Sequence, residues 1–325
     1  MKHDLDRLCE LGVLTKTNDS KWASLNFIIP KKYGTVRFVS DFRKLNSVLK
    51  QKPYLIPKTQ DVLQKLGGFT YATSLDLNMR YYTICLRLGS SWLCTFITPW
   101  GKYQYNWLSM GIAGAPDVFQ EKMSELMGGL KFFRTYLDDL LTITKGTFDD
   151  NLEKVEQVLK RLQVAGLRCN KKKYSFATQE IEYLGYLLVP MGIRSLAKKV
   201  ESIQQLAWPA TVRQLRHLIS MINYCCDMWK QCSHVLARLT KILSKQSKKK
   251  IIWGIKQEKA FNRTKELISA DAMLMFPQFG KPFEVHTNAS NYQFGSVISQ
   301  NGKPIAFYSW KFTSTQQRYT LGKRM

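Results

Sequence analysis

The chain has 325 residues, 45% of them hydrophobic, which is long enough for two or three globular domains with substantial cores. Its 49 lysines and arginines outnumber 24 acidic residues and give a net charge of +25. This surplus favours nucleic acid over a membrane as partner, because each phosphate that is neutralised releases counterions. No run approaches the roughly 20 apolar residues of a membrane span.

The first 190 residues alternate short predicted strands with predicted helices. The clearest helix covers residues 147–165, where Leu152, Val155, Leu159 and Leu162 recur at helical spacing and Gly166 follows. A second helix starts at Pro116, and a third covers residues 59–66. Strands are predicted at residues 26–29, 36–40, 71–76, 81–86, 92–98, 103–107, 132–135 and 140–144.

From about Ser195 the pattern becomes helical. Helices are predicted at residues 196–206, 211–224 and 256–269, with Thr211 as an N-cap. The middle helix should bury one face, made of Leu215, Leu218, Ile219 and Ile222. After Pro277, strands are predicted at residues 283–287, 294–299 and 304–309.

Residues 230–257 hold eight basic residues and no acidic residue. Two interpretations stay open for this stretch. It forms either a face that follows phosphates or a loop near a tether between domains.

The seven cysteines lack paired metal-ligand spacing. Cys225, Cys226, Cys232 and His234 lie close together but match no common zinc pattern, so we expect buried free thiols in a reducing compartment. Residues 1–10 include acids and no apolar stretch typical of a signal peptide. These features predict an intracellular protein, cytoplasmic or nuclear.

Two adjacent carboxylates, Asp138 and Asp139, lie between the predicted strands at 132–135 and 140–144. A third, Asp76, ends the strand at 71–76. Taken alone, an Asp pair in a hairpin is more often simple turn chemistry. Three carboxylates brought to one point, however, suit Mg²⁺, which prefers oxygen ligands. Two such ions about 4 Å apart can clamp the attacking and leaving oxygens of a phosphoryl transfer.

Further motifs occur in a fixed order around these carboxylates. They are Trp22-Ala-Ser, Pro30-Lys-Lys-Tyr-Gly-Thr-Val-Arg37, Ser40-Asp-Phe-Arg-Lys-Leu-Asn46, Ser74-Leu-Asp-Leu77, Met110-Gly111, Ala115-Pro116, Phe119-Gln120, Tyr136-Leu-Asp-Asp139, Gly166-Leu, Asn170, Lys173, Tyr183-Leu-Gly-Tyr186 and Phe307-Tyr-Ser309. Together they resemble the reverse transcriptase region of a gypsy-type long-terminal-repeat retrotransposon polyprotein, followed by the truncated start of its ribonuclease H domain.

The resemblance implies an α+β, right-hand polymerase fold with fingers, palm and thumb, followed by a partial RNase H-like mixed sheet. The implied domains are residues 1–190 for fingers and palm, 191–270 for the helical thumb and connection, and 271–325 for the RNase H-like part. The implied activity is RNA-directed DNA polymerase, acting on an RNA or DNA template-primer duplex with dNTPs. No membrane partner is implied, and the oligomeric state is left open.

The resemblance also assigns roles. Asp76, Asp138 and Asp139 would be the catalytic, metal-binding carboxylates, holding two Mg²⁺ ions, with Mn²⁺ as the alternative. Tyr81 would face the sugar and exclude a 2′-hydroxyl, although a core tyrosine is the competing interpretation. The remaining dNTP-binding residues would be Lys32, Arg37, Met110, Gly111 and Lys173, and the primer grip would be Leu184, Gly185 and Tyr186. For Lys32 and Arg37 the alternative is solvated hairpin cations.

Several positions depart from the family pattern, among them Leu25, which stands in place of Pro, and Cys225, which stands where Arg is usual. Arg80 stands where the family has Gly, and Ser109 where it has Pro. Asn288 stands in place of the first RNase H aspartate, and the sequence ends where the catalytic Glu would follow, so RNase H activity is expected to be absent. These departures leave a second hypothesis open, a catalytically decayed fragment that folds and binds nucleic acid without activity.

Overall fold

The chain folds into two compact units, Met1–Val62 with Tyr71–Ala177, and Leu63–Thr70 with Thr178–Met325. The computed structural model describes residues 2–30, 36–78, 80–87, 89–170, 173–224, 226–230, 232–245, 251, 253–269, 273–290, 293–313 and 315–318. The domain boundaries at residues 190 and 270 stay predictions.

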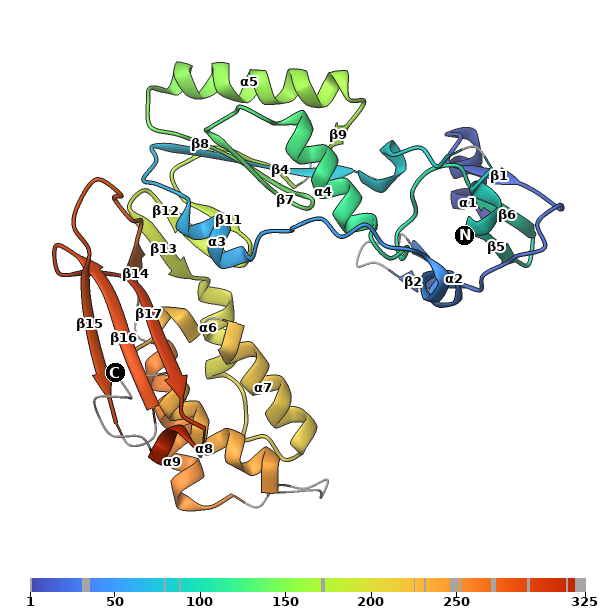
Figure 1. The fold of residues 1–325 in the computed structure, drawn as a ribbon. Helices are drawn as coiled ribbons and strands as arrows, with labels where there is room; N and C mark the ends of the chain where they lie inside the picture. The colour runs from blue at the N-terminus through green and yellow to red at the C-terminus, as the bar shows by residue number, and fades with distance from the viewer. Residues whose placement is uncertain are drawn as a thin grey trace. The chain divides into compact units, whose positions relative to one another are not determined.

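The first unit contains the sheet that carries the acidic hairpin (Figure 1). Its strand order is β10-β4-β8-β7, and β9 also pairs with β4. The predicted strands at 71–76, 132–135 and 140–144 are confirmed to within two residues. The strands are β4 (Tyr71–Asn78), β7 (Phe133–Tyr136), β8 (Asp139–Thr144), β9 (Arg168–Cys169) and β10 (Ser175–Thr178).

Two smaller sheets complete the strands of this unit. A hairpin pairs β2 with β3, and a three-stranded sheet has the order β1-β6-β5. Their bounds are β1 (Leu14–Lys16), β2 (Asn26–Pro30), β3 (Val36–Ser40), β5 (Thr95–Thr98) and β6 (Gly101–Tyr105). The helices are α1 (Lys2–Glu10), α2 (Arg43–Val48), α4 (Ala115–Leu126) and α5 (Phe148–Val164), and the boundary between the units falls within α3 (Thr59–Gln64).

Helix α5 begins and ends as the sequence predicts. The Thr147 hydroxyl caps its start by accepting the Asp150 N–H at 3.2 Å, and two acidic residues in the first turn favour the helix dipole. Gly166, with φ of 69°, ends it, because only glycine adopts this left-handed conformation without strain.

The buried face of α5 differs from the predicted one. The buried side chains are Asn151, Val155, Val158 and Leu162, whereas Leu152 and Leu159 are exposed. Both stripes have helical spacing and share two members, so periodicity could not separate them. Asn151 is buried because its amide donates to the Thr144 hydroxyl of β8 at 2.9 Å.

The run at 81–86 was predicted to be a strand, and this is wrong. Arg80–Thr83 forms the 3₁₀ helix η1 instead. A strand would send Tyr81 and Tyr82 to opposite faces. The tight turn lets both rings pack inward, Tyr81 against Phe119 at 5.7 Å and Tyr82 against Tyr105 at 6.1 Å between ring centroids. Likewise, the run at 92–98 splits into a second 3₁₀ turn, η2 (Ser91–Cys94), followed by β5.

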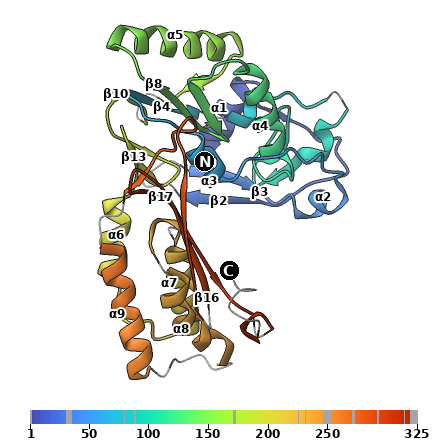
Figure 2. The same cartoon turned by 60° about the vertical axis from the view of Figure 1, so that its left-hand side comes forward.

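The second unit combines a helix bundle with two sheets (Figure 2). The strand orders are β11-β12-β13-β14 and β15-β16-β17, and every pairing is antiparallel. The strands are β11 (Ile181–Tyr183), β12 (Tyr186–Val189), β13 (Gly192–Ser195), β14 (Met273–Met275), β15 (Glu284–Ala289), β16 (Gln293–Gln300) and β17 (Lys303–Lys311). The helices are α6 (Ala197–Gln204), α7 (Val212–Tyr224), α8 (Cys232–Lys245) and α9 (Ile255–Ser269).

Helix α7 confirms its predicted face and cap. Leu215, Leu218, Ile219 and Ile222 are all buried, and the Thr211 hydroxyl accepts the Gln214 N–H at 3.2 Å. Helix α8 was not predicted, because residues 230–257 were interpreted by their basic charge alone. Its apolar stripe, Val235, Leu236, Leu239 and Ile242, is buried.

The expectation of free, buried thiols is wrong for three cysteines. Cys226 and Cys232 form a disulfide, since η3 (Cys226–Met228) and the start of α8 bring their Cα atoms to 5.5 Å, within bridging distance. Cys85 is free but exposed. In the described part of the chain, no helix combines the length and apolarity needed to cross a bilayer.

The buried face of α5 yields a stability prediction with a matched control. Leu162→Ala should lower the free energy of unfolding by about 2–5 kcal/mol, because it opens a cavity at a side chain that is 1% exposed. The same change at Leu159, which is 42% exposed, should cost less than about 1 kcal/mol. Urea unfolding followed by circular dichroism measures both, and equal losses would contradict the assignment of the buried face.

Candidate active site

The acidic hairpin turns over two residues. Tyr136 pairs with Asp139, so Leu137 and Asp138 form the loop between β7 and β8. Leu137 has φ of 54°, a conformation that residues with a side chain seldom adopt. Such strain, about 1–3 kcal/mol, persists only where the surroundings hold the backbone.

The side chain that holds this turn is Gln120 of α4. Its carbonyl oxygen accepts the Leu137 N–H at 2.7 Å, and its amide nitrogen lies 3.4 Å from the Thr135 carbonyl oxygen. Gln120 is buried. An amide serves here because it accepts and donates at once without adding charge beside the carboxylates. The sequence placed Gln120 in a motif but assigned it no role.

Asp76 and Asp139 lie directly opposite each other on β4 and β8. Paired residues on antiparallel strands have Cα atoms about 4.5–5.5 Å apart and side chains on the same face of the sheet. Asp138 is the next residue, in the turn. The structure therefore brings together, on paired strands, carboxylates that are more than sixty positions apart in the sequence.

Lys173 also reaches this place. Its ammonium lies 3.0 Å from a carboxylate oxygen of Asp76, and the two side chains are 62% and 24% exposed. The Asp76 carbonyl accepts the Asn170 N–H at 2.8 Å, which ties the segment after α5 to β4. Two causes raise the pKa of the neighbouring Cys169 thiol: burial, which has the larger effect, and the negative charge of Asp76. Cys169 is therefore neutral at pH 7.

The donor atoms available here suit a hard divalent cation, since carboxylate oxygens are what Mg²⁺ prefers. A cation, the Lys173 ammonium, already lies against Asp76. Across the residues that the structure describes, no three His, Cys, Asp or Glu side chains are arranged as a finished metal site. The type of ligand and the backbone pairing of these carboxylates therefore suit a divalent cation. Their side chains, however, are not arranged around one point.

The Met110-Gly111 segment is held by a second amide, that of Asn46. Its nitrogen donates to the Gly111 carbonyl and its oxygen accepts the Ala113 N–H, both at 2.8 Å. Gly111 has φ of 97°, and a Cβ there would lie 3.3 Å from the Ser40 carbonyl oxygen. Glycine is therefore required by the backbone. Asn46 stood in a predicted motif, but no local pattern revealed its partner.

A buried polar network lies near this segment. The Tyr105 hydroxyl lies 3.3 Å from the Ser40 hydroxyl, and the hydroxyl of Ser109, in the position where the resemblance expects Pro, donates to the Met110 carbonyl at 3.2 Å. Burial raises the pKa of Tyr105, and burial together with Tyr105 raises the pKa of Tyr82. The hydroxyl of Ser109 is therefore accommodated by a hydrogen bond.

The other predicted site residues make different contacts where the structure describes them. Tyr81 is 6% exposed, and its ring meets Phe119 edge-on, so the structure shows the core contact while the sugar-facing role stays a prediction. Arg37, on β3, pairs with Ile29, on β2, and Lys32 lies outside the described residues. In the second unit, Leu184 and Gly185 connect β11 to β12, and Tyr186 begins β12. Asn288, on β15, pairs with Gly295, on β16.

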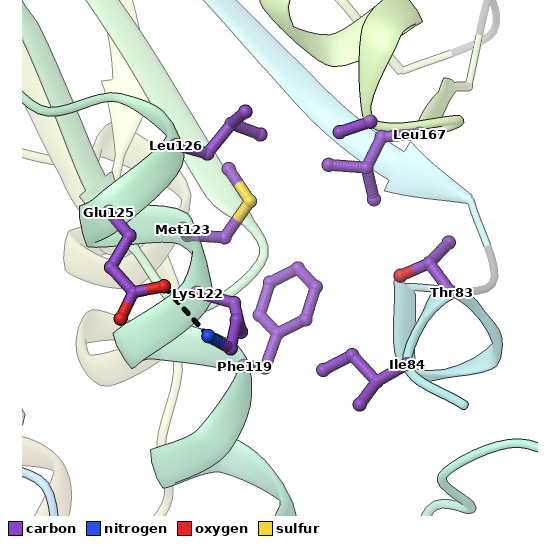
Figure 3. A pocket seen from close by; sticks show the side chains of 9 residues that line it. Thr83, Ile84, Phe119, Lys122, Met123, Glu125, Leu126 and Leu167 are labelled. Carbon is purple, nitrogen blue, oxygen red and sulfur yellow. Dashed lines mark hydrogen bonds and ion pairs between the residues drawn. The ribbon is translucent and has the colours of Figure 1, made fainter. Parts of the chain in front are cut away.

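A cavity of about 560 Å³ lies within the first unit, between α4 and the segments at Thr83 and Leu167 (Figure 3). Its walls are mostly apolar, and a 2.7 Å ion pair joins Lys122 and Glu125 on α4. Phe119, which also packs edge-on against Tyr81, forms part of the wall. The lining residues are Thr83, Ile84, Phe119, Lys122, Met123, Glu125, Leu126, Ala165 and Leu167.

An antiparallel sheet that presents a Tyr-Leu-Asp-Asp turn beside an aspartate strand, with helices packed on it, defines a right-hand nucleic acid polymerase. Solved structures agree on the fold. The foamy viral protease-reverse transcriptase in complex with double-stranded DNA superimposes with a TM-score of 0.93 over 99% of this chain and 57% of that one, at 23% identity. The same enzyme with an RNA/DNA hybrid gives 0.90 over 99% and 44%, also at 23% identity.

Family models identify the segments. Residues 29–188 match the reverse transcriptase (RNA-dependent DNA polymerase) family, and residues 253–325 match the RNase H-like domain found in reverse transcriptase. The chain therefore contains a reverse transcriptase domain, followed by an RNase H-like segment.

Curated relatives are polyproteins. The Pol polyprotein from transposon opus of Drosophila melanogaster is 30% identical over 100% of this chain and 34% of its own length. That from transposon 297 of the same fly is 30% identical over 98% and 31%. The Tf2-3 polyprotein of Schizosaccharomyces pombe is 27% identical over 100% and 24%. The chain thus spans about a quarter to a third of these relatives.

The grip of Gln120 on the acidic turn can be tested without any enzyme assay. Gln120→Leu should leave the Leu137 N–H without its acceptor and speed its hydrogen exchange about tenfold or more, since an unpaired buried donor costs about 1–3 kcal/mol. Gln163→Leu, at an exposed position on α5, is the control. Unchanged protection of the Leu137 amide in the Gln120 variant would contradict the assignment.

Proposed function

We propose that this chain is an RNA-directed DNA polymerase that adds deoxynucleotides to the 3′-hydroxyl of a primer. The observation that supports this most directly is the register of the palm sheet, which pairs Asp76 with Asp139 and places Asp138 in the adjoining turn. In the reaction, the primer hydroxyl attacks the α-phosphorus of the nucleotide and pyrophosphate leaves. Positioning and charge neutralisation would supply most of the rate enhancement.

Asp76, Asp138 and Asp139 would hold two Mg²⁺ ions, or Mn²⁺ in their place. When bound, these ions would activate the primer hydroxyl and neutralise charge on the triphosphate. Lys173, now paired with Asp76, would turn toward the leaving pyrophosphate, a move that its 62% exposed side chain allows. Lys32 and Arg37 would grip the triphosphate.

The nucleotide would lie between two protein walls. Gly111 would sit under the base and sugar, held close by Asn46. Tyr81, fixed edge-on by Phe119, would close the space that a 2′-hydroxyl needs and so select deoxynucleotides. A ring fixed by the core suits this role, because a movable one would give way to the extra hydroxyl.

The proposed macromolecular partner is an RNA or DNA template-primer duplex inside the cell. The net charge of +25 supports it, and so do the foamy viral structures, which were solved with double-stranded DNA and with an RNA/DNA hybrid. We do not propose RNase H activity, because Asn288 offers a neutral amide where that site needs a carboxylate.

Removing one ligand charge tests the metal-binding role. Asp138→Asn should lower primer extension by at least about 10²-fold while the duplex affinity stays within about twofold, since the basic surface is unchanged. Asp149→Asn, at an exposed residue in the first turn of α5, should extend primers normally. If binding falls in proportion to activity, Asp138 is structural instead.

Duplex binding itself should be strongly salt-dependent. Between about 50 and 200 mM salt we expect the affinity to fall about tenfold or more, because neutralised phosphates release counterions. Fluorescence anisotropy of a labelled primer-template gives the slope of log K against log salt. A flat dependence would argue against nucleic acid as the partner.

Arg80 distinguishes an active enzyme from a decayed one. A long cation in place of Gly, next to Tyr81, is expected to misplace the nucleotide, and a shift of about 1 Å can cost about 10²-fold in rate. Arg80→Gly should therefore raise primer extension, and adding Asp76→Asn should erase the gain. If the unmodified chain already matches the Arg80→Gly variant, the decay hypothesis loses its main support.

A further inference from the structure

The disulfide between Cys226 and Cys232 closes a short loop inside the second unit. It joins η3 to the first residue of α8, and the two cysteines are six positions apart in the sequence. Between them lie Met228 and Trp229, whose side chains are 1% and 4% exposed. The bond therefore closes a loop that is also held by two buried side chains.

The two sides of this loop attach to different sheets of the same unit. The Ser195 hydroxyl, at the end of β13, donates to the Met228 sulfur at 3.3 Å. Directly after Cys232, the Ser233 hydroxyl donates to the Ser309 carbonyl of β17 at 2.8 Å. The disulfide thus links a segment that contacts one sheet to a helix end that contacts the other.

The start of α8 is the part that the bond holds most directly. A helix frays at its ends, because the first four backbone N–H groups lack acceptors within the helix. Helix α8 begins at Cys232, so the covalent bond fixes the residue at which fraying would start. The apolar stripe of the helix lies farther along, from Val235 to Ile242, and packs independently of the bond. Opening the disulfide would therefore loosen the first turn and leave the rest of α8 in place.

The two cysteines differ in their access to solvent. Cys232 is 3% exposed, whereas Cys226 is partly exposed. A thiolate from solvent can therefore attack the Cys226 sulfur. The attack displaces Cys232 as a thiolate, which takes up a proton, and leaves a mixed disulfide on Cys226. A second thiol of the same reductant then forms the reductant's own disulfide and releases Cys226 as a thiol.

We propose that the Cys226–Cys232 disulfide is a redox-sensitive tie that sets whether the first turn of α8 is fixed to η3. A dithiol opens it by supplying two electrons and two protons, and leaves as a cyclic disulfide. Disulfides of proteins kept in reducing compartments are usually transient or redox-sensing. For the intracellular setting proposed above, a reversible tie fits better than a permanent one. The inference concerns the second unit alone and does not depend on polymerase activity.

Peptide mass spectrometry of the full chain tests the bond. Trypsin cuts after Lys230, so an intact bond links peptide 217–230 to peptide 231–238. We expect this linked pair after oxidation with glutathione disulfide, and two separate peptides after dithiothreitol. Peptide 217–230 also contains Cys225, which lies outside the described residues. Cys225→Ser should therefore keep the linked pair, and its loss would show a different pairing and refute the proposal.

Hydrogen exchange of the same two forms tests the conformational effect. Reduction should speed exchange in the first turn of α8 about tenfold or more, and leave the turns around Leu239 unchanged. It should also lower Tm by about 5 °C, because the opened loop regains chain entropy on unfolding. The double variant Cys226→Ala/Cys232→Ala should match the reduced wild type and should not respond to dithiothreitol. Cys85→Ser, which removes an exposed free thiol of the first unit, is the control and should respond as the wild type does.

The remaining outcomes overturn the proposal. Absence of the linked peptides after oxidation shows that the bond does not form. Linked peptides with equal exchange in both forms show that the bond does not control α8. Loss of protection throughout the second unit on reduction shows a bond required for folding rather than a local switch. If the double variant does not fold, the comparison of oxidised with reduced wild type, which carries no substitution, decides between these results.

Discussion

The antiparallel pairing of β4 with β8 is the constraint on which the site depends. It sets Asp76 against Asp139 and so concentrates negative charge at one end of a sheet. Like charges placed opposite each other on paired strands destabilise the sheet. The fold accommodates them by burying the apolar residues farther along the same strands, Leu75 and Leu140 among them, and by setting Lys173 against Asp76. A divalent cation would relieve the same repulsion, so the cost in stability and the capacity to bind an ion have one origin.

Uncharged or singly charged side chains from helices hold three of the loop segments that the motifs single out. Gln120 of α4 fixes the acidic turn, and Asn46 of α2 fixes the segment at Gly111. Lys199 and Tyr224 do the same for the Leu184-Gly185 turn. In each case a helix, which is stabilised by its own backbone hydrogen bonds, supplies a rigid base for a strained loop. If the proposed polymerase site is right, a mobile acidic turn would misalign the reacting atoms, and misalignment of about 1 Å is costly in rate.

The sequence predicted the acidic hairpin and its strands because alternation and turn chemistry are local signals. Helix α7 was predicted with its cap and its buried face for the same reason.

Three errors have non-local causes. The run at Tyr81 packs both tyrosines inward through a 3₁₀ turn, which depends on Phe119 and Tyr105, far away in the chain. The buried face of α5 differs from the predicted one and includes Asn151, which hydrogen-bonds to Thr144 of another element. The disulfide required the distance between Cys226 and Cys232, which spacing alone does not give. Gln120 and Asn46 stood in predicted motifs, but a hydrogen-bond partner cannot be read from a motif.

The most direct test of this account is a titration of Mn²⁺ into the chain bound to a primer-template, followed by electron paramagnetic resonance of the free ion. The account predicts binding in the wild type, marked weakening in Asp76→Asn and Asp138→Asn, and no change in Asp149→Asn, because only the first two remove a carboxylate charge from β4 and the acidic turn. Equal Mn²⁺ binding in all four proteins would contradict the claim that the pairing of β4 with β8 builds a divalent cation site.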